Sequence, residues 1–211
     1  MNIVRNRSIV LLALLFSLAP HALAATQSPD ATSQSSVASG APAPLPGDSI
    51  YRLPIALTDQ DGKDFHLADR RGTLQLVSMF YTSCPYVCPL IIDTIKKTQR
   101  ALSADEQKRL QVLLVSFDPE RDSVTRLKET AGQRKIDAAT WTLARTATPS
   151  VRKLAAVLGV QYRALANREI NHSTSIVLLD KDGRIIARTD RLGATDADFV
   201  AALHKALGVD R

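Results

Sequence analysis

The chain reads Leu74-Gln75-Leu76-Val77-Ser78-Met79-Phe80 and continues at once as Tyr81-Thr82-Ser83-Cys84-Pro85-Tyr86-Val87-Cys88-Pro89. The first run is almost entirely apolar and predicts a buried β-strand, and the apolar residues after Pro89 recur at helical spacing. The two cysteines are the only thiols of the protein. Because a helix N-terminus favours thiolates, and thiolates attack disulfides and bind metals, this strand-to-helix turn predicts a chemical site.

The cysteines are separated by three residues, and this spacing bears on their chemistry. Residues four apart share one face of a helical turn, so both sulfurs can point at one site. Redox pairs of the thioredoxin type usually have two intervening residues, whereas the third residue here leaves room for a soft metal ion. Thiolates select Cu(I) or Zn(II), and an imidazole suits both. A small structural disulfide is the alternative, although closing so short a loop removes little chain entropy.

The N-terminal segment has the pattern of a secretory signal. Arg5 and Arg7 precede an apolar run over residues 9–19, and Ala22-Leu23-Ala24 supplies a small-x-small cleavage pattern. The run is short for a membrane span, so residues 1–24 are predicted to be a signal peptide, with an uncleaved anchor as the alternative. Residues 25–48, poor in bulky apolar side chains, are predicted to be a disordered linker. Residues 49–211 then form one exported domain, and we expect it in the periplasm, where a cysteine pair can be oxidised.

The charge balance limits the partners. The chain carries 27 basic and 21 acidic residues, a net charge of +6, and loses two arginines with the signal segment. Aromatic residues make up only 5% of the chain and are not interleaved with basic clusters, which argues against nucleic-acid binding. The moderate positive charge fits an acidic partner or proximity to a membrane surface.

The remaining patterns predict strands that alternate with helices. Asp-Gly steps at residues 61–62 and 182–183 indicate two β-hairpins, and residues 110–117 form an apolar run typical of a doubly buried strand. The expected helices begin near Cys88, at a Ser103–Glu106 capping box, after Ser123, at Thr148 as N-cap and at Asp196. A loop is expected over residues 162–171. Together these elements indicate an α/β sandwich with a mixed central sheet flanked by helices and an N-terminal β-hairpin.

A third metal ligand has to come from four histidines. His21 falls in the signal segment, and His66 and His204 have no motif around them and are interpreted as ordinary surface or part-buried residues. His172 precedes the predicted strand at residues 176–179, whose start faces the cysteine loop in a thioredoxin-like fold. Thiol–disulfide oxidoreductases normally have a cis-proline at that place, but no proline occurs after Pro149. The departure favours His172 as a metal ligand.

Four segments together resemble the Sco/SenC family. They are residues 57–63, the cysteine motif at residues 80–89, the run Val115-Ser116-Phe117-Asp118-Pro119-Glu120-Arg121-Asp122, and His172 before a strand that ends in Asp180-Lys181-Asp182-Gly183. The resemblance extends over about residues 50 to 208. It implies a thioredoxin fold and a copper-binding protein for assembly of cytochrome c oxidase. It also implies that Cys84, Cys88 and His172 bind Cu(I) or Cu(II).

Three residues near the motifs need separate interpretation. Tyr86 and Asn171 stand where the family commonly has aspartate, so the charge near the metal is less negative here. Asp118 is interpreted as a turn and helix-capping residue, with a contact near the metal as the alternative. Trp141 is assigned to the core rather than to the site.

Three functions are compatible with these features. The first is a copper metallochaperone without turnover of its own, which delivers copper to a copper-receiving subunit of a respiratory oxidase or prepares that site. Its other partners would be a periplasmic copper chaperone or a thiol reductase. The second is a thiol–disulfide oxidoreductase in which Cys84 and Cys88 are the redox-active pair. A peroxidase is disfavoured, because Tyr81 and Val77 stand where peroxiredoxins place threonine and proline.

Overall fold

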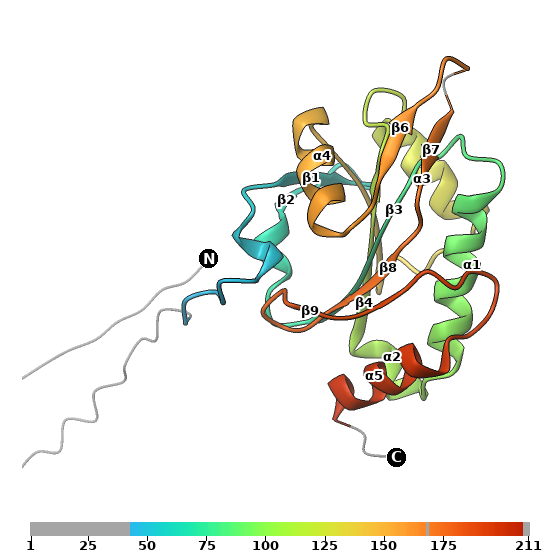
Figure 1. The fold of residues 1–211 in the computed structure, drawn as a ribbon. Coiled ribbons are helices and arrows are strands. Elements are labelled where there is room, and N and C mark those ends of the chain that lie inside the picture. Colours follow the sequence, from blue (N-terminus) through green and yellow to red (C-terminus); the bar gives the residue numbers. More distant parts are fainter. Residues whose placement is uncertain (1–42, 168, 209–211) are drawn as a thin grey trace, which may run out of the picture. The chain divides into compact units, whose positions relative to one another are not determined.

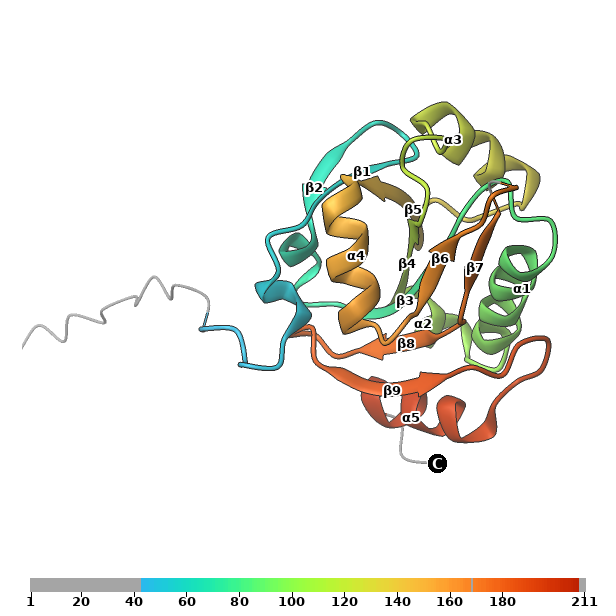
Figure 2. The same ribbon diagram turned by 45° about the horizontal axis from the view of Figure 1, so that its top comes forward.

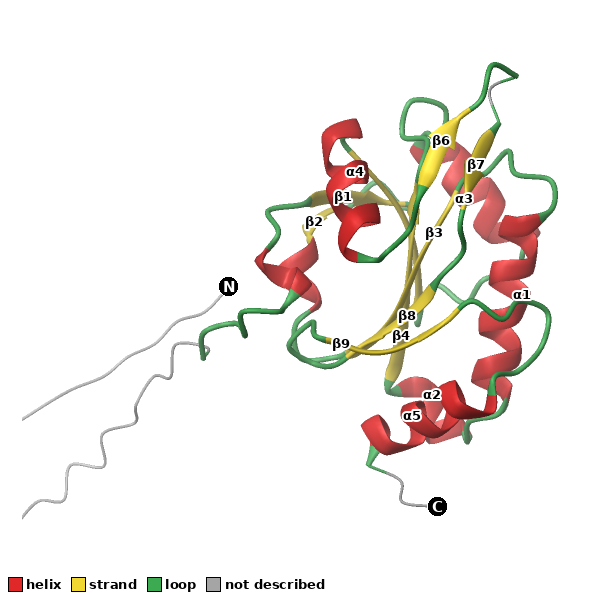
Figure 3. Cartoon of the chain, viewed as in Figure 1, coloured by secondary structure: helices red, strands yellow, loops and turns green. Residues whose placement is uncertain are grey.

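The computed structural model describes residues 43–167 and 169–208, so the expected signal peptide and most of the expected linker lie outside the described residues. The described chain forms a central seven-stranded sheet, a separate two-stranded sheet, helices and two short 3-10 helices, η1 and η2 (Figures 1 and 3). In chain order the elements are η1 (Ile50–Arg52), β1 (Ala56–Asp59), β2 (Asp64–His66), η2 (Leu67–Arg70), β3 (Leu74–Phe80), α1 (Val87–Arg100), α2 (Ala104–Lys108), β4 (Leu110–Ser116), α3 (Val124–Gln133), β5 (Trp141–Thr146), α4 (Thr148–Val157), β6 (Tyr162–Ala164), β7 (Ile170–His172), β8 (Ile176–Leu179), β9 (Ile185–Thr189) and α5 (Ala197–Leu207).

The sheet is mixed, and its strand order is β2-β1-β5-β4-β3-β8-β9. Strands β3, β4 and β5 run parallel, while β8 and β1 join them antiparallel on either side. All seven residues of β3 are buried, as a strand covered on both faces requires. The two Asp-Gly hairpins are confirmed as the pairs β1–β2 and β8–β9.

Helices cover both faces of this sheet. Figure 2 shows α4 on one face and α1 with α3 on the other; α1 and α3 connect the successive parallel strands β3, β4 and β5, and crossovers of one hand place both helices on the same face. Trp141 lies in the core, as predicted, and its indole N–H donates to the Gln99 side-chain oxygen at 3.0 Å. Within the described part of the chain, no helix is both long and apolar enough to cross a bilayer.

Two predicted helix starts are wrong by one or two residues. The N-cap of α1 is Tyr86 rather than Cys88, so Pro89 is the third helical residue. The first helical N–H groups have no partner within the helix, and a proline there removes no hydrogen bond. The N-cap of α4 is Ala147 rather than Thr148, with Pro149 tolerated in the first turn for the same reason. The Ser103–Glu106 capping box at α2 is confirmed.

The expected loop over residues 162–171 is instead a hairpin. Strands β6 and β7 pair antiparallel, with Tyr162 opposite His172 and Ala164 opposite Ile170. Three-residue strands are too short for a clear alternation of polar and apolar residues, so this pattern could not predict them. The hairpin carries His172 at its end, and it therefore determines where the imidazole lies.

The turn between β8 and β9 packs against the N-terminal segment. Gly183 has a φ of +78°, and a Cβ atom added there would lie 2.5 Å from Cδ2 of Tyr51. Its carbonyl also accepts a hydrogen bond from the Ile50 N–H at 3.0 Å. Only glycine satisfies both this conformation and this close approach.

Candidate metal centre

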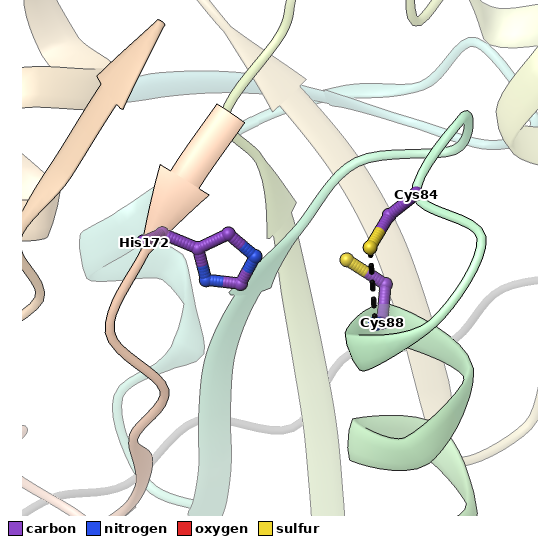
Figure 4. Close-up of side chains that lie close together, drawn as sticks. All are labelled: Cys84, Cys88 and His172. Carbon is purple, nitrogen blue, oxygen red and sulfur yellow. Dashed lines mark hydrogen bonds between the residues drawn. The ribbon is translucent and has the colours of Figure 1, made fainter. Parts of the chain in front are cut away.

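The three predicted ligands lie together at one end of the sheet. Residue Cys84 is in the loop after β3, Cys88 in the first turn of α1, and His172 at the end of β7 (Figure 4). One ligand atom from each lies within 4.8 Å of the other two, the only such group of three in the described residues. Both cysteines are buried, and the histidine is half-buried. The assignment of these residues as metal ligands stays a prediction, but their convergence is observed.

The two sulfurs have different surroundings. The Cys88 N–H donates to the Cys84 sulfur at 3.3 Å, the bond drawn in Figure 4, and the Tyr81 N–H donates to the Cys88 sulfur at 3.4 Å. The Cys88 thiol and then backbone N–H groups at the start of α1 lower the pKa of Cys84 to about 4, despite its burial. The same thiol–thiolate hydrogen bond, together with burial, raises the pKa of Cys88. The pair therefore holds one thiolate and one thiol around neutral pH.

The imidazole of His172 is oriented with one nitrogen free. Its Nδ1 lies 3.0 Å from the Ser173 carbonyl oxygen, which can only accept, so Nδ1 carries the hydrogen in the neutral ring. The lone pair is then on Nε2, as a metal-binding imidazole requires. The ring also packs at a tilt on Phe117, with 4.9 Å between ring centroids, and edge-on against Tyr81 at 6.1 Å.

Two aromatic residues hold the β6–β7 hairpin beside the cysteine loop. The Ile170 N–H donates to the Tyr81 hydroxyl oxygen at 3.4 Å. Phe117, at the end of β4, contacts Tyr162 of β6 with 5.2 Å between centroids. Neither aromatic was predicted to belong to the site, although both lie in the segments that resemble the Sco/SenC family and at the ends of predicted strands.

A buried carboxylate ties the cysteine loop to β4. Asp122 is 0% exposed and accepts from the Thr82 N–H at 3.1 Å, the Thr82 hydroxyl at 2.5 Å and the Ser116 hydroxyl at 2.5 Å. Thr82 is two residues before Cys84, so these bonds fix the approach of the chain to the first cysteine. Asp122 ends one of the segments that resemble the Sco/SenC family, but no role was predicted for it from the sequence.

Asp118 is the turn residue that was expected, but the predicted helix-capping role is wrong, because Ser123 is the N-cap of α3. Asp118 pairs with Arg121, whose backbone N–H bonds to both its carbonyl and its carboxylate. It lines a neighbouring cavity of about 1100 Å³ rather than the hollow at the cysteines. The contact near the metal that was considered for Asp118 is therefore not seen.

The other described histidines stay apart from the site. His66 is exposed beside Asp69, with 3.9 Å between Nδ1 and the carboxylate oxygen. His204 Nδ1 lies 2.7 Å from the buried Glu106 carboxylate and links α5 to α2. These contacts agree with the expectation that neither histidine is a ligand.

The site opens into a hollow of about 270 Å³ between the cysteine loop and the β6–β7 hairpin. Its rim includes the two residues that depart from the common family pattern, Tyr86 and Asn171. Both side chains are exposed, Tyr86 to 82%. The substitutions therefore alter the outer surface of the site rather than its interior.

The model of the SCO1/SenC family matches residues 46–208. The chain belongs to the SCO1/SenC family. A SCO1 protein homolog of Bacillus subtilis is 24% identical over 138 residues, which cover 63% of this chain and 70% of the relative. A Stutzerimonas stutzeri protein named as a candidate copper-binding protein is 24% identical over 135 residues, 62% of this chain and 65% of that protein's length.

Solved structures share the fold. Bradyrhizobium japonicum ScoI with copper bound is 25% identical with a TM-score of 0.62, and the match covers 73% of this chain and 98% of that one. Yeast Sco1 with copper bound is 21% identical with a TM-score of 0.63, covering 75% and 89% of the two chains. The predicted thioredoxin-like α/β fold is confirmed by these similarities and by the mixed sheet.

Proposed function

We propose that this SCO1/SenC protein is a copper metallochaperone that binds one copper ion through Cys84, Cys88 and His172. The observation that carries the proposal is the convergence of two sulfurs and one imidazole nitrogen within 4.8 Å. These soft and borderline donors suit copper in both oxidation states. Relatives whose structures contain copper support the choice of metal.

The recipient in this proposal is the copper site of cytochrome c oxidase, to which the protein delivers copper or which it prepares for copper. Cys84 and His172 line the hollow, so a ligand of the recipient could reach a copper ion held by these residues from that side. Copper is then passed by ligand exchange, without turnover of a substrate. We place this activity in the periplasm, on the basis of the expected signal in residues 1–24.

Copper titrations of single variants test the ligand set. His172→Ala should retain Cu(I), because two thiolates satisfy its preference for low coordination, but should lose the thiolate-to-copper absorption of a stable Cu(II) complex. The double variant Cys84→Ala/Cys88→Ala should bind neither form stoichiometrically. The matched control is His66→Ala, which should behave as wild type. An intact Cu(II) spectrum in His172→Ala would show that another residue supplies the nitrogen ligand.

A thiol–disulfide oxidoreductase is the second candidate, and the unequal thiols favour it. A thiolate at Cys84 can attack a client disulfide and release one client thiol; Cys88 then attacks the Cys84 sulfur of the mixed disulfide and releases the second client thiol, which leaves a Cys84–Cys88 disulfide. The client disulfide gains two electrons and two protons, and the cysteine pair loses them. Copper-free reduced protein should then reduce the client's cysteines stoichiometrically. Reduction that is fast without copper, combined with weak copper binding, would favour this function over metal transfer.

A further inference from the structure

Exposed apolar side chains gather at the mouth of the metal centre. Three large apolar residues are exposed in the described chain, Tyr86 at 82%, Ile186 at 46% and Leu90 at 39%. Two of them stand four residues apart at the start of α1: Tyr86 is its N-cap and lines the hollow at Cys84, and Leu90 follows one turn later, outside that lining. Tyr86 and Leu90 are one helical turn apart along the chain and both are exposed, and together they are called the rim patch here.

The rim patch is electrically neutral. No charged residue occurs from Thr73 through Ile92, a run that includes the whole cysteine loop and the first turn of α1. Pro85 is also exposed, and Val87 and Pro89 are half-buried. Across the hollow, Glu169 is the only carboxylate among the residues that line it. The cysteine-loop side of the hollow is thus uncharged and apolar, and the one carboxylate of its lining stands on the opposite, hairpin side.

The patch is backed by rigid structure. The Gly193 N–H donates to the Thr94 hydroxyl at 2.8 Å, which holds the loop before α5 against α1. A Cβ atom built on Gly193 would lie 3.5 Å from Cδ1 of Leu90, so this loop supports the leucine from behind. A prearranged apolar surface loses little conformational entropy when a partner covers it.

A metal ligand from a partner reaches the sulfurs through the hollow that Tyr86 borders. Cys84 is 8% exposed and Cys88 is 3% exposed, so an incoming metal ligand has to enter through the hollow that Tyr86 borders. A macromolecule that inserts a ligand there must cover the tyrosine ring. Aromatic side chains at such positions are frequent anchors of protein interfaces.

We infer that Tyr86 and Leu90 are the docking contact for the copper-receiving domain, and that this domain presents its metal ligands on a loop with an uncharged, apolar face. The inference rests on the proposed copper transfer and adds the chemistry by which the recipient is recognised. The uncharged rim patch disfavours binding of partners that have charged side chains around their own metal site. A charged side chain covered by this patch would lose its bound water without gaining a counter-charge.

The test compares copper transfer to a protein with transfer to a small molecule. Wild type, Tyr86→Ser, Leu90→Ser and Tyr86→Phe are loaded with Cu(I) and mixed with the soluble, copper-free copper-site domain of the oxidase subunit, or with the chelator bathocuproine disulfonate. We expect Tyr86→Ser and Leu90→Ser to slow transfer to the domain about tenfold, the loss typical of a truncated interface anchor. Transfer to the chelator should not change, and Tyr86→Phe should behave as wild type.

The control is Ile186→Ser, an equally drastic change at an exposed apolar residue of β9 outside the hollow. It should leave both transfers unchanged, and the effect of Tyr86→Ser should persist at high salt, since an apolar contact is not screened. Unchanged transfer to the domain by Tyr86→Ser and Leu90→Ser, equal slowing with the chelator, or disappearance of the effect at high salt would overturn the inference. If wild type transfers no copper to the domain, the proposed function itself fails.

Discussion

Replacement of Asp122 by alanine should destabilise the whole domain, because its carboxylate is the tie between the cysteine loop and the end of β4. The side chain is fully buried and accepts from the Thr82 N–H, the Thr82 hydroxyl and the Ser116 hydroxyl. The alanine variant leaves one backbone N–H without an acceptor and removes two further strong bonds. The expected consequence is a looser cysteine loop in a less stable protein.

The magnitude follows from these three bonds. Hydrogen bonds to a carboxylate contribute about 1.5–3 kcal/mol each, but burial of the carboxylate costs several kcal/mol, and the two hydroxyls can rotate toward other acceptors. The net loss should be about 3 kcal/mol of unfolding free energy. For a domain of this size, that loss lowers Tm by about 6–12 °C.

Urea and thermal unfolding of the reduced, copper-free protein measure this loss. Asp105→Ala is the matched control, because Asp105 pairs with Lys108 at 3.1 Å on the surface and both side chains are largely exposed. Such a pair contributes about 0–1 kcal/mol. If Asp122→Ala lost no more stability than Asp105→Ala, the carboxylate would not be the structural tie described above.

The thiols and one turn give two further predictions. Because the folded-state pKa of Cys84 is lowered to about 4, from about 8.5 in an unfolded chain, the ultraviolet thiolate absorption of the reduced protein should appear near pH 4. The stability that the Cys84 thiolate contributes to the fold should be lost as pH falls from about 8.5 to 4. Cys84→Ser should abolish both the absorption change and this loss of stability. A first thiolate that appears only above neutral pH would contradict the hydrogen bond from Cys88. Gly183→Ala should lower the free energy of unfolding by about 3 kcal/mol, because Gly183 has a positive φ and an added Cβ atom would overlap the Tyr51 ring. Gly208 has a similar φ but open space around it, so Gly208→Ala should lower that free energy by less. Thermal unfolding measures both losses. Equal losses in the two glycine variants would mean that the overlap relaxes freely.

The sequence predicted the elements whose signals are local and strong. Continuous apolar runs gave β3 and β4, Asp-Gly steps gave both hairpins of the main sheet, and the capping box gave α2. The β6–β7 hairpin could not be found this way. It is held by contacts distant in sequence, from the Tyr81 hydroxyl and the Phe117 ring, which no local pattern reveals.

The sequence predicted the three candidate ligands, but not the residues around them that hold the cysteine loop in place. Two cysteines in one motif and a single well-placed histidine narrowed the ligand choice, and the structure brings all three together. The role of Asp122 required knowledge that the end of β4 lies beside Thr82, which follows from the parallel pairing of β3 and β4. Likewise, the sequence did not place Tyr86 at the helix start, because α1 has its N-cap at Tyr86, two residues before the expected cap at Cys88.

The separation of the ligands along the chain has a consequence for biogenesis. His172 follows Cys88 by 84 positions, and β3 must pair with β8, which comes nearly a hundred residues later. Such non-local pairing gives a high contact order and slow folding. In a growing chain both thiols are therefore present before the imidazole that completes the set of ligands. A three-ligand copper site can therefore form only after β8 has joined the sheet, whereas the cysteine pair is complete as soon as α1 has formed.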